Sequence, residues 1–274
     1  MVILVTGATG LVGRHLVDIL VAQGIKVRAA TRHPEAAKLP ATVQLGADLD
    51  GVEAVFLHPR AVRDPFDFLA RARAQGVRRV VALSAMNVDD PLDQQPSRSV
   101  GDRNKEAEDA AVASGLEWIS LRPSSFASNS GRAFGPAIRA GDVVRYVYPT
   151  FVESPIHERD LAAVAAHALR TDDLLSTRVD LTGPDSLSHR SMVSIIGTVL
   201  GRPLRFEEIT PDAAEWAMIR AGLPEPFVTG LLARYARHLD RPQHPANAEV
   251  ATILDRPALT YAEWVTENAD TFRN

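Results

Sequence analysis

The opening of the chain alternates between two hydrophobic patterns. Residues 2–5 form a continuous apolar run rich in β-branched side chains, which predicts a strand buried on both faces. Residues 11–20 instead carry apolar side chains at helical spacing, so we expect a helix there that ends at Gly24. Residues 26–30 predict a second strand. Strand, glycine-punctuated turn, helix and strand together form one βαβ unit.

The same alternation continues along the chain and predicts a parallel sheet. Only residues 47–53 separate a candidate strand at 43–46 from the next one, too few for a crossover helix. Pro123 is expected to break a strand at 116–121, and residues 91–97 to form a polar surface loop. This rhythm indicates an α/β fold with a doubly wound parallel sheet. The other expected strands are 54–58, 79–84, 143–147 and 178–182, and the other helices are 65–75, 102–114, 134–140 and 158–170.

Beyond residue 188 the pattern is mostly helical. We therefore expect a Rossmann sheet with a smaller, mostly helical C-terminal lobe. The dinucleotide-binding core is expected to cover residues 1–125 and to be completed by roughly 154–184. Residues 126–153 and 185–274 are expected to form the smaller, substrate-side lobe. The core of this lobe is expected to include apolar residues that recur at helical spacing, namely Trp216, Met218, Phe227 and Tyr235.

The turn after the first strand contains Gly7, Gly10 and Gly13. Small residues there let backbone N–H groups and a helix N-terminus approach a pyrophosphate. Between a buried strand and an amphipathic helix, this turn predicts dinucleotide binding. A tight turn with no ligand is the alternative, but it leaves three glycines in helical register unexplained. The expected cofactor contacts on this turn also include Thr9, Leu11 and Val12.

Arg32 follows the second expected strand, nineteen residues beyond Gly13, where the residue that selects between NAD and NADP is expected. An acid here would accept hydrogen bonds from the ribose 2′-OH of NAD, whereas an arginine pairs with the 2′-phosphate of NADP. We therefore expect NADP(H) to be preferred over NAD(H). A solvated surface arginine is the alternative.

Composition narrows the function classes. The chain has 274 residues, 46% of them hydrophobic, and its formal net charge of −4 argues against a nucleic-acid partner. Cysteine is absent, which excludes disulfides, thiolate metal sites and cysteine nucleophiles. No signal-like segment and no long uncharged apolar run exist, so we expect a cytoplasmic protein with no membrane partner. We expect a small-molecule substrate and no metal, and a homodimer stays open.

Five motifs occur in order along the chain: Thr6-Gly-Ala-Thr-Gly-x-x-Gly13, Leu83-Ser84-Ala85, Ser114-Gly-Leu-Glu-Trp-Ile-Ser-Leu-Arg-Pro123, Asp160-Leu-Ala and Leu181-Thr-Gly-Pro184. Together they resemble the NmrA-like family of atypical short-chain dehydrogenases/reductases. The resemblance covers nearly the whole chain. It implies a Rossmann domain that binds NADP(H) and a smaller C-terminal lobe over the nicotinamide end.

Catalytic members of the wider superfamily begin the helix after the serine-bearing strand with a Tyr-x-x-x-Lys pair. The tyrosine gives a proton to a carbonyl oxygen, while the lysine holds the ribose and lowers the pKa of the tyrosine. Extended members carry a glutamate four residues after the lysine. If Glu108 matches that glutamate, the pair falls on Val100 and Asn104. Lys105 comes one residue late, about 100° around the helix. The resemblance therefore implies the family fold without its usual acid–base pair.

Ser84 and His58 are the candidate catalytic residues, because both end expected strands, where open α/β sheets place ligands. His58 can exchange a proton near neutral pH, and a histidine bonded to nearby backbone is the alternative. For Ser84 the alternative is a strand-ending turn serine. His157 either faces the cleft or simply precedes a helix. Ser84 and His58 are also expected to contact the cofactor, as by the resemblance are residues beside the nicotinamide, Pro123, Ser124 and Phe126.

The leading hypothesis is an NADPH-dependent oxidoreductase of this atypical type. A quinone or another conjugated compound is favoured as substrate over a simple ketone, since it asks less of a protein acid. Hydride transfer needs chiefly a positioned nicotinamide and an apolar cleft. Two alternatives stay open: a non-catalytic NADP(H) sensor that a protein partner reads, and a redox-neutral isomerase-like enzyme with His58 or another cleft residue as base.

Overall fold

A computed structural model describes residues 1–240 and 244–273. A seven-stranded, all-parallel sheet forms its centre, in the order β3-β2-β1-β4-β5-β6-β9. The order reverses between β1 and β4, which makes the carboxyl ends of these two strands the switch point of a doubly wound sheet. The strands are β1 (Val2–Thr6), β2 (Lys26–Ala30), β3 (Gln44–Leu45), β4 (Ala54–Leu57), β5 (Arg79–Leu83), β6 (Glu117–Pro123) and β9 (Thr177–Leu181).

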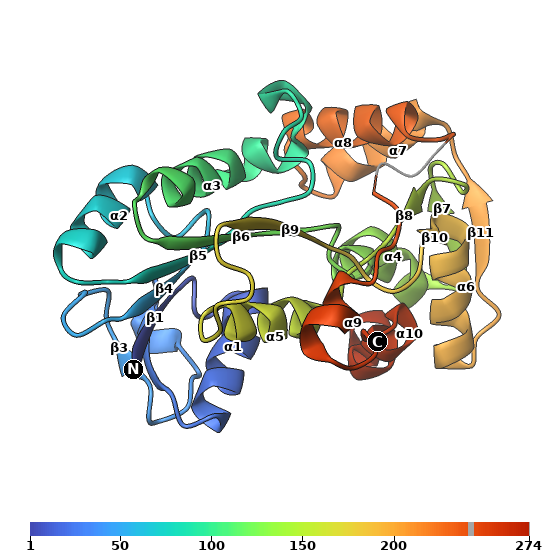
Figure 1. Cartoon of the computed structure of the whole chain (residues 1–274). Helices are drawn as coiled ribbons and strands as arrows, with labels where there is room; N and C mark the ends of the chain where they lie inside the picture. Colours follow the sequence, from blue (N-terminus) through green and yellow to red (C-terminus); the bar gives the residue numbers. More distant parts are fainter. Residues whose placement is uncertain (241–243, 274) are drawn as a thin grey trace.

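Helices cover both faces of this sheet (Figure 1). The helices α1 (Leu11–Ala22) and α5 (Glu158–Ala168) pack together on one face, and α2 (Pro65–Ala74) and α3 (Asn104–Ala113) on the other. A hydrophobic cluster fills each side, because the strands of a parallel sheet are apolar on both faces. The expected Rossmann fold is confirmed.

The chain passes from β3 to β4 without a helix. The short β3 pairs with β2 at the sheet edge, and β4 pairs with β1 on the other side. Arg28 on β2 is buried and donates hydrogen bonds to the carbonyls of Asp48 and Asp50. This arginine therefore stabilises the short connection between β3 and β4. The strand expected near residue 43 is confirmed as an edge strand of two residues.

The second half of the chain adds helices and two small sheets (Figure 1). β7 (Val143–Tyr146) pairs in parallel with β11 (Arg205–Glu208), and β8 (Val152–Glu153) pairs antiparallel with β10 (Leu187–Ser188). Around them lie α4 (Asn129–Ala140), α6 (His189–Leu200), α7 (Pro211–Arg220), α8 (Glu225–Arg237) and α10 (Tyr261–Glu267). These elements bury their own hydrophobic cluster. The smaller, mostly helical C-terminal lobe is therefore present, and its exact boundaries stay a prediction.

One C-terminal helix returns to the central sheet. α9 (Glu249–Leu254) packs on α5 and β9, and Val250 is buried in the hydrophobic cluster beside α1. The side chain of Asn247 donates to the carbonyl of Asp180 on β9. Arg256 forms an ion pair with Asp160 on α5. The chain then crosses back, because α10 packs on α6.

Three local expectations were wrong. β6 continues two residues beyond the expected end at residue 121 and ends at Pro123 itself. Residues 91–97 are not a plain surface loop: 3₁₀ turns at Leu92–Gln94 and Pro96–Val100 pack against α8, and Pro96 is buried. Trp216 is 64% exposed, although Met218 and Tyr235 are buried as expected.

Within the described residues, no helix combines the length and the apolar character that a membrane crossing requires.

Candidate functional site

The turn between β1 and α1 brings backbone close to backbone. Gly7 has a φ of +67°, which favours glycine. A Cβ atom on Gly13 would lie 2.2 Å from the carbonyl oxygen of Gly7, so no side chain fits there. Gly10 caps α1, and no side chain occupies the N–H groups of the first turn. These features fit a pyrophosphate, whose charge would meet free N–H groups and the positive end of the helix dipole.

Two residues on this turn, Leu11 and Val12, can contact a ligand in different ways. Leu11 is 54% exposed at the first helical position, whereas the side chain of Val12 is in the core. Val12 can therefore offer a ligand only its backbone. The hydroxyl of Thr9 lies 3.1 Å from that of Thr31, which joins the turn to the end of β2.

His58 lies against the same turn. A Cβ atom on Gly7 would be 2.9 Å from Cγ of His58, so the imidazole covers the glycine. The His58 backbone N–H donates to Thr6 Oγ1 at 2.8 Å, and that hydroxyl donates to the carbonyl of Phe56. Nδ1 of His58 accepts from the N–H of Arg60. These bonds fix His58 beside the glycine turn.

Burial lowers the pKa of His58, although the nearby Asp102 carboxylate raises it and Arg60 and Arg32 lower it. The ring is therefore neutral near pH 7, with Nδ1 as an acceptor. This geometry is that of a histidine bonded to nearby backbone, and the role of His58 as an acid stays a prediction.

Arg32 is exposed directly after β2. Its guanidinium makes no ion pair or hydrogen bond with another described residue, in contrast to Arg28, which is engaged by the residue 48–50 segment. The carboxyl end of β2 thus presents the positive charge of Arg32, which is not paired with another described residue, beside the Thr9–Thr31 pair.

The carboxyl ends of β5 and β6 form the other half of the site. Ser84 is buried, its N–H donates to the carbonyl of Leu121 on β6, and its hydroxyl has no hydrogen-bond partner among the described residues. The N–H of Met86 donates to the carbonyl of Pro123. The hydroxyl of Ser124 is turned away, since it donates to the carbonyl of Ser154. Phe126 is half-buried and its backbone forms a bridge with Ile156.

The positions matched to the tyrosine–lysine pair hold no acid. Val100 ends the 3₁₀ turn, and Asn104 is the first residue of α3 and is buried. Nζ of Lys105 lies 2.7 Å from the carboxylate of Asp109, one helical turn away. The lysine is therefore occupied on a different face of α3 from Asn104.

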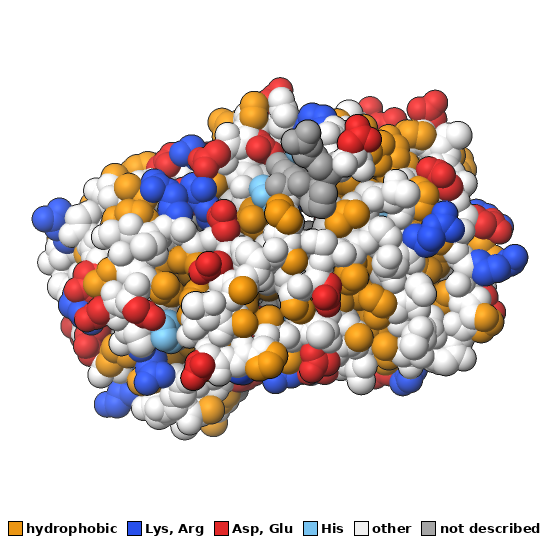
Figure 2. Space-filling view, turned by 45° about the vertical axis from the view of Figure 1, so that its right-hand side comes forward, with side chains coloured by type: hydrophobic (Ala, Val, Ile, Leu, Met, Phe, Trp, Pro, Cys, Tyr) orange, Lys and Arg blue, Asp and Glu red, His pale blue; other side chains and the backbone are white. Residues whose placement is uncertain are grey.

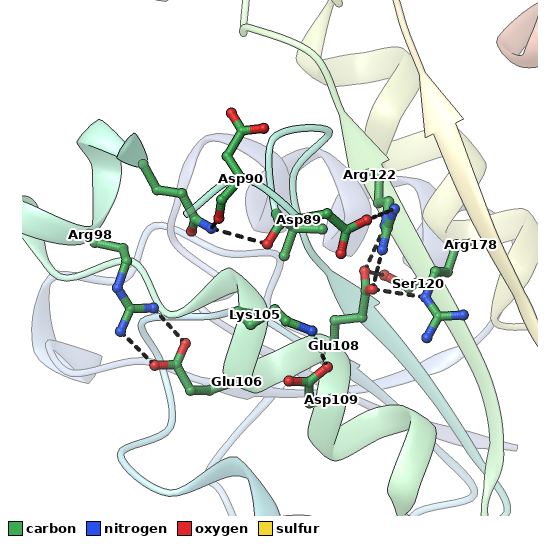
Figure 3. A network of polar contacts seen from close by, with 12 residues as sticks. Asp89, Asp90, Arg98, Lys105, Glu106, Glu108, Asp109, Ser120, Arg122 and Arg178 are labelled. Atoms are coloured by element: carbon green, nitrogen blue, oxygen red, sulfur yellow. Dashed lines mark hydrogen bonds and ion pairs between the residues drawn. The ribbon is translucent and has the colours of Figure 1, made fainter. Parts of the chain in front are cut away.

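Glu108, one turn beyond Asn104, is the centre of a buried network (Figure 3). Its carboxylate accepts from the Ser120 hydroxyl at 2.6 Å, from Arg122 Nε at 2.9 Å and from Arg178 Nε at 2.9 Å. Arg122 also pairs with Asp89 at 2.8 Å. Burial alone would raise the pKa of Glu108, but these hydrogen bonds outweigh it and hold the pKa at about 2. The network ties α3 to β6 and β9.

The structure adds a small polar cavity of about 10 Å³, room for about one water, that sequence reasoning missed. It lies where the residues after β6 meet β8, α8 and the segment after α8. The lining residues are Ser124, Ser125, Val152, Glu153, Ser154, Arg234 and His244. Ser125 lies in the segment that resembles the family's segment beside the nicotinamide, but the resemblance assigns it no role. Arg234 and His244 carry no local signal, because a single arginine on a helix and a histidine between two prolines are ordinary surface patterns.

Polar groups in this pocket are poorly satisfied. Ser125 Oγ and His244 Nε2 are buried and find no hydrogen-bond partner among the described residues. Arg234 lies 3.7 Å from the Glu153 carboxylate and stacks over the ring of Phe151. Burial, together with the nearby positive charge of Arg234, lowers the pKa of His244 to about 4. The pocket therefore pairs one cation with one anion and adds a neutral imidazole and a hydroxyl.

Other candidates have structural roles. His157 caps α5 through Nδ1, which accepts from the N–H of Arg159, and its Nε2 lies 3.4 Å from Glu267. No group of three or more potential ligands that could hold a metal occurs in residues 1–240 and 244–273. On the face shown in Figure 2, basic and acidic side chains are interspersed and do not form a patch of one sign.

Comparison with known proteins supports the cofactor site. A family model described as NAD(P)H-binding matches residues 7–172. A Streptomyces griseus protein named (4-alkanoyl-5-oxo-2,5-dihydrofuran-3-yl)methyl phosphate reductase is 34% identical, covering 98% of this chain and 99% of its own. An NAD(P)H azoreductase from Xenophilus azovorans is 28% identical over 98% of this chain and 99% of its own.

The fold has solved counterparts. The NADPH complex of an Escherichia coli NADPH-dependent quinone oxidoreductase superposes with a TM-score of 0.80, at 19% identity, over 98% of this chain and 100% of that one. At that identity the likeness establishes the fold. The glycine turn, the switch point and the family match together lead to one assignment: the chain belongs to the NAD(P)H-binding family of NmrA-like, atypical short-chain dehydrogenases/reductases.

Proposed function

We propose that this chain is an NADPH-dependent reductase of a small conjugated substrate, such as an unsaturated lactone or a quinone, and that it works without a tyrosine–lysine pair. When bound, NADPH supplies the hydride, while the chain supplies binding and orientation. The observation that carries the proposal lies at the positions matched to the tyrosine–lysine pair, where Val100 and the buried Asn104 stand and the neighbouring Lys105 is paired with Asp109.

The tyrosines of the chain lie in, or pack against, the hydrophobic cluster of the C-terminal lobe. The sequence contains four, and none of them lines the pocket. Burial raises the pKa of Tyr146 to about 12, and it also raises the pKa of Tyr235 and Tyr261. Phenols held protonated in a hydrophobic core are poor proton donors to a substrate. A simple ketone, whose reduction forms a basic alkoxide, therefore suits this site less than a conjugated acceptor.

The names of relatives support the substrate class. The name of the Streptomyces griseus reductase describes an unsaturated lactone that carries an alkanoyl group, so a carbon–carbon double bond is conjugated with carbonyl oxygens. The Escherichia coli counterpart is named for quinones. Both compound classes delocalise the charge that hydride addition creates, so neither requires a strong acid in the protein.

The proposal predicts a clear substrate preference. With NADPH, we expect 1,4-benzoquinone and 3-acetyl-2(5H)-furanone to turn over with kcat/KM at least about 100-fold above cyclohexanone, because only the ketone needs strong acid assistance. The loss of absorbance at the reduced-nicotinamide band measures this.

Fast reduction of cyclohexanone would contradict the proposal. Tight NADPH binding with no turnover of any acceptor would favour the sensor, and turnover with no net change in the cofactor would favour the isomerase. The cytoplasmic location expected from the sequence stays a prediction, and a homodimer stays an open alternative.

We further propose that Arg32 selects NADP(H). The Arg32→Ala variant should weaken NADPH binding by roughly 1.5–3 kcal/mol and leave NADH binding nearly unchanged, because the charge-assisted guanidinium–phosphate pair is available only to NADP. Isothermal titration calorimetry with both cofactors measures the difference. Arg71→Ala, which removes an exposed arginine on α2, is the charge-matched control. Equal losses for both cofactors in Arg32→Ala would rule out this role.

A further inference from the structure

We propose that Arg60 is a second cation of the cofactor site and that its guanidinium, oriented by Asp102, binds the diphosphate of NAD(P)H. The inference rests on the NAD(P)H-binding family to which the chain belongs, and not on the reductase activity proposed above. It gives a role to a residue that lies outside the five sequence motifs, in the turn after β4.

The backbone of Arg60 is held close to the glycine turn. The N–H of Ala61 donates to the carbonyl of His58 at 3.0 Å, which closes a β-turn with Pro59 and Arg60 at its centre. The N–H of Arg60 donates to Nδ1 of His58 at 3.2 Å, and the ring of His58 covers Gly7. These two hydrogen bonds fix Arg60 at the carboxyl end of β4, beside the turn where a diphosphate would bind.

The side chain of Arg60 is directed toward the segment before α3. Its Nε donates to Oδ1 of Asp102 in an ion pair. Asp102 is itself held, because its N–H donates to the carbonyl of Ser97 at 3.0 Å. Asn104, which begins α3, is the position matched to the lysine that holds the nicotinamide ribose in the wider superfamily. The side chain of Arg60 therefore spans from the glycine turn toward the nicotinamide side of the cofactor site.

The ion pair leaves one edge of the guanidinium available. Nε is the atom that donates to Asp102, and neither Nη1 nor Nη2 has a hydrogen-bond partner in residues 1–240 and 244–273. These two groups form the planar fork that binds phosphate oxygens through two parallel hydrogen bonds. The side chain is 41% exposed, so a ligand can reach it. Asp102 would fix the direction of the fork before the ligand arrives, which lowers the entropy that binding costs.

Two arginines flank the glycine turn. Arg32 follows β2 and Arg60 follows β4, and these strands pair with β1 on opposite sides. Burial lowers the pKa of His58 and Asp102 raises it, whereas the positive charges of Arg60 and Arg32 both lower it, so both charges reach the imidazole that covers Gly7. NADPH carries one phosphate on its adenosine ribose and a diphosphate at its centre. This arrangement matches the 2′-phosphate with Arg32 and the diphosphate with Arg60.

The two arginines should give different patterns with the two cofactors. Calorimetric titration compares NADPH and NADH in the full chain as wild type, Arg60→Ala and Arg32→Ala. Arg60→Ala should weaken both cofactors by the same factor, roughly tenfold, because both carry the diphosphate. Arg32→Ala should weaken NADPH alone. Arg60→Lys keeps the charge but loses the fork, so it should weaken each cofactor by only about threefold.

Arg71→Ala is the matched control, because it also breaks an ion pair between an arginine Nε and an aspartate. Arg71 lies on α2, and its loss should leave both Kd values within about twofold of wild type. Circular dichroism checks folding, which should be preserved because the Arg60–Asp102 pair is partly exposed and contributes little stability. A loss of affinity in Arg71→Ala equal to that in Arg60→Ala would reflect only the net charge and would overturn the assignment.

Two further results would also overturn it. If Arg60→Ala binds both cofactors as wild type does, Arg60 does not contact the cofactor. If it weakens NADPH and leaves NADH unchanged, the guanidinium binds the 2′-phosphate and not the diphosphate. None of these measurements requires turnover, so the proposed function is tested separately. A wild type that reduces no acceptor, together with equal losses for both cofactors in Arg60→Ala, would remove the reductase and keep this inference.

Discussion

Gly10→Val is expected to abolish NADPH binding, raising the Kd at least about 100-fold, while the chain stays folded. Gly10 is the N-cap of α1, with a φ of −77° and a ψ of 177° that valine can also adopt. A Cβ atom there would lie 3.2 Å from the carbonyl oxygen of Gly7, which a small shift relieves. The branched side chain would instead occupy the space through which a pyrophosphate reaches the first N–H groups of the helix. Calorimetric titration with NADPH and far-ultraviolet circular dichroism measure the two halves of this expectation.

Substitutions of two other glycines serve as comparisons for Gly10→Val. Gly141 has extended backbone with nothing within 4 Å of a Cβ atom, so Gly141→Val should change neither binding nor folding. Gly13 meets backbone at 2.2 Å, so Gly13→Ala should lose folded protein as well as binding. Unchanged NADPH affinity in folded Gly10→Val would mean that the turn has only a structural role.

Glu108→Ala should lower the free energy of unfolding by about 3 kcal/mol. Its side chain is 1% exposed, and its loss leaves Arg122, which is 12% exposed, without its main counter-charge. It also leaves the fully buried hydroxyl of Ser120 without its acceptor. Chemical denaturation measures the change. Glu106→Ala is the matched control on the same helix, since Glu106 pairs with Arg98 near the surface and should cost about 0–1 kcal/mol (Figure 3).

The effect of Glu108 should depend on pH with a defined sign. Its pKa is held at about 2 in the folded chain, below the ordinary value of 4.5. The stabilisation is therefore fully present above about pH 4.5 and is lost as the pH falls toward about 2. The difference between wild type and Glu108→Ala should shrink over this range. A difference that stays constant from pH 7 to pH 3 would show that packing, and not charge, accounts for the loss.

The sequence predicted the fold well where the signal is local. Continuous apolar runs such as residues 2–5 identified the central strands, because a strand buried on both faces has no polar side to mask it. The same reasoning failed for β8 and β10, two residues each, whose pairing is set by tertiary contacts. Trp216 has the spacing of a core residue, yet its ring lies at the surface under Arg220, because periodicity does not tell which face of a helix is covered.

The candidate site was also predicted better where its residues are close together in the sequence. The glycine turn and Arg32 lie within one βαβ unit, so their relation could be inferred from spacing alone. Ser125 and His244 are brought together by the packing of the C-terminal lobe, and no periodicity relates them. His58 shows a middle case: its place at a strand end was predicted, but its contact with Gly7 depends on β4 lying next to β1, which the short β3–β4 connection left uncertain.

The return of α9 to the central sheet governs how this enzyme could be recombined with a relative. A chimaera that exchanged everything after residue 184 would import a foreign α9 against the native α5 and β9, and would break the Arg256–Asp160 pair as well. A cassette that stops at residue 240 would transfer α8 with Arg234 and keep the α9 interface from a single parent. Crossover points at the two ends of residues 185–240 therefore spare the α9 interface and move the interface between the two parents to α6 and α10.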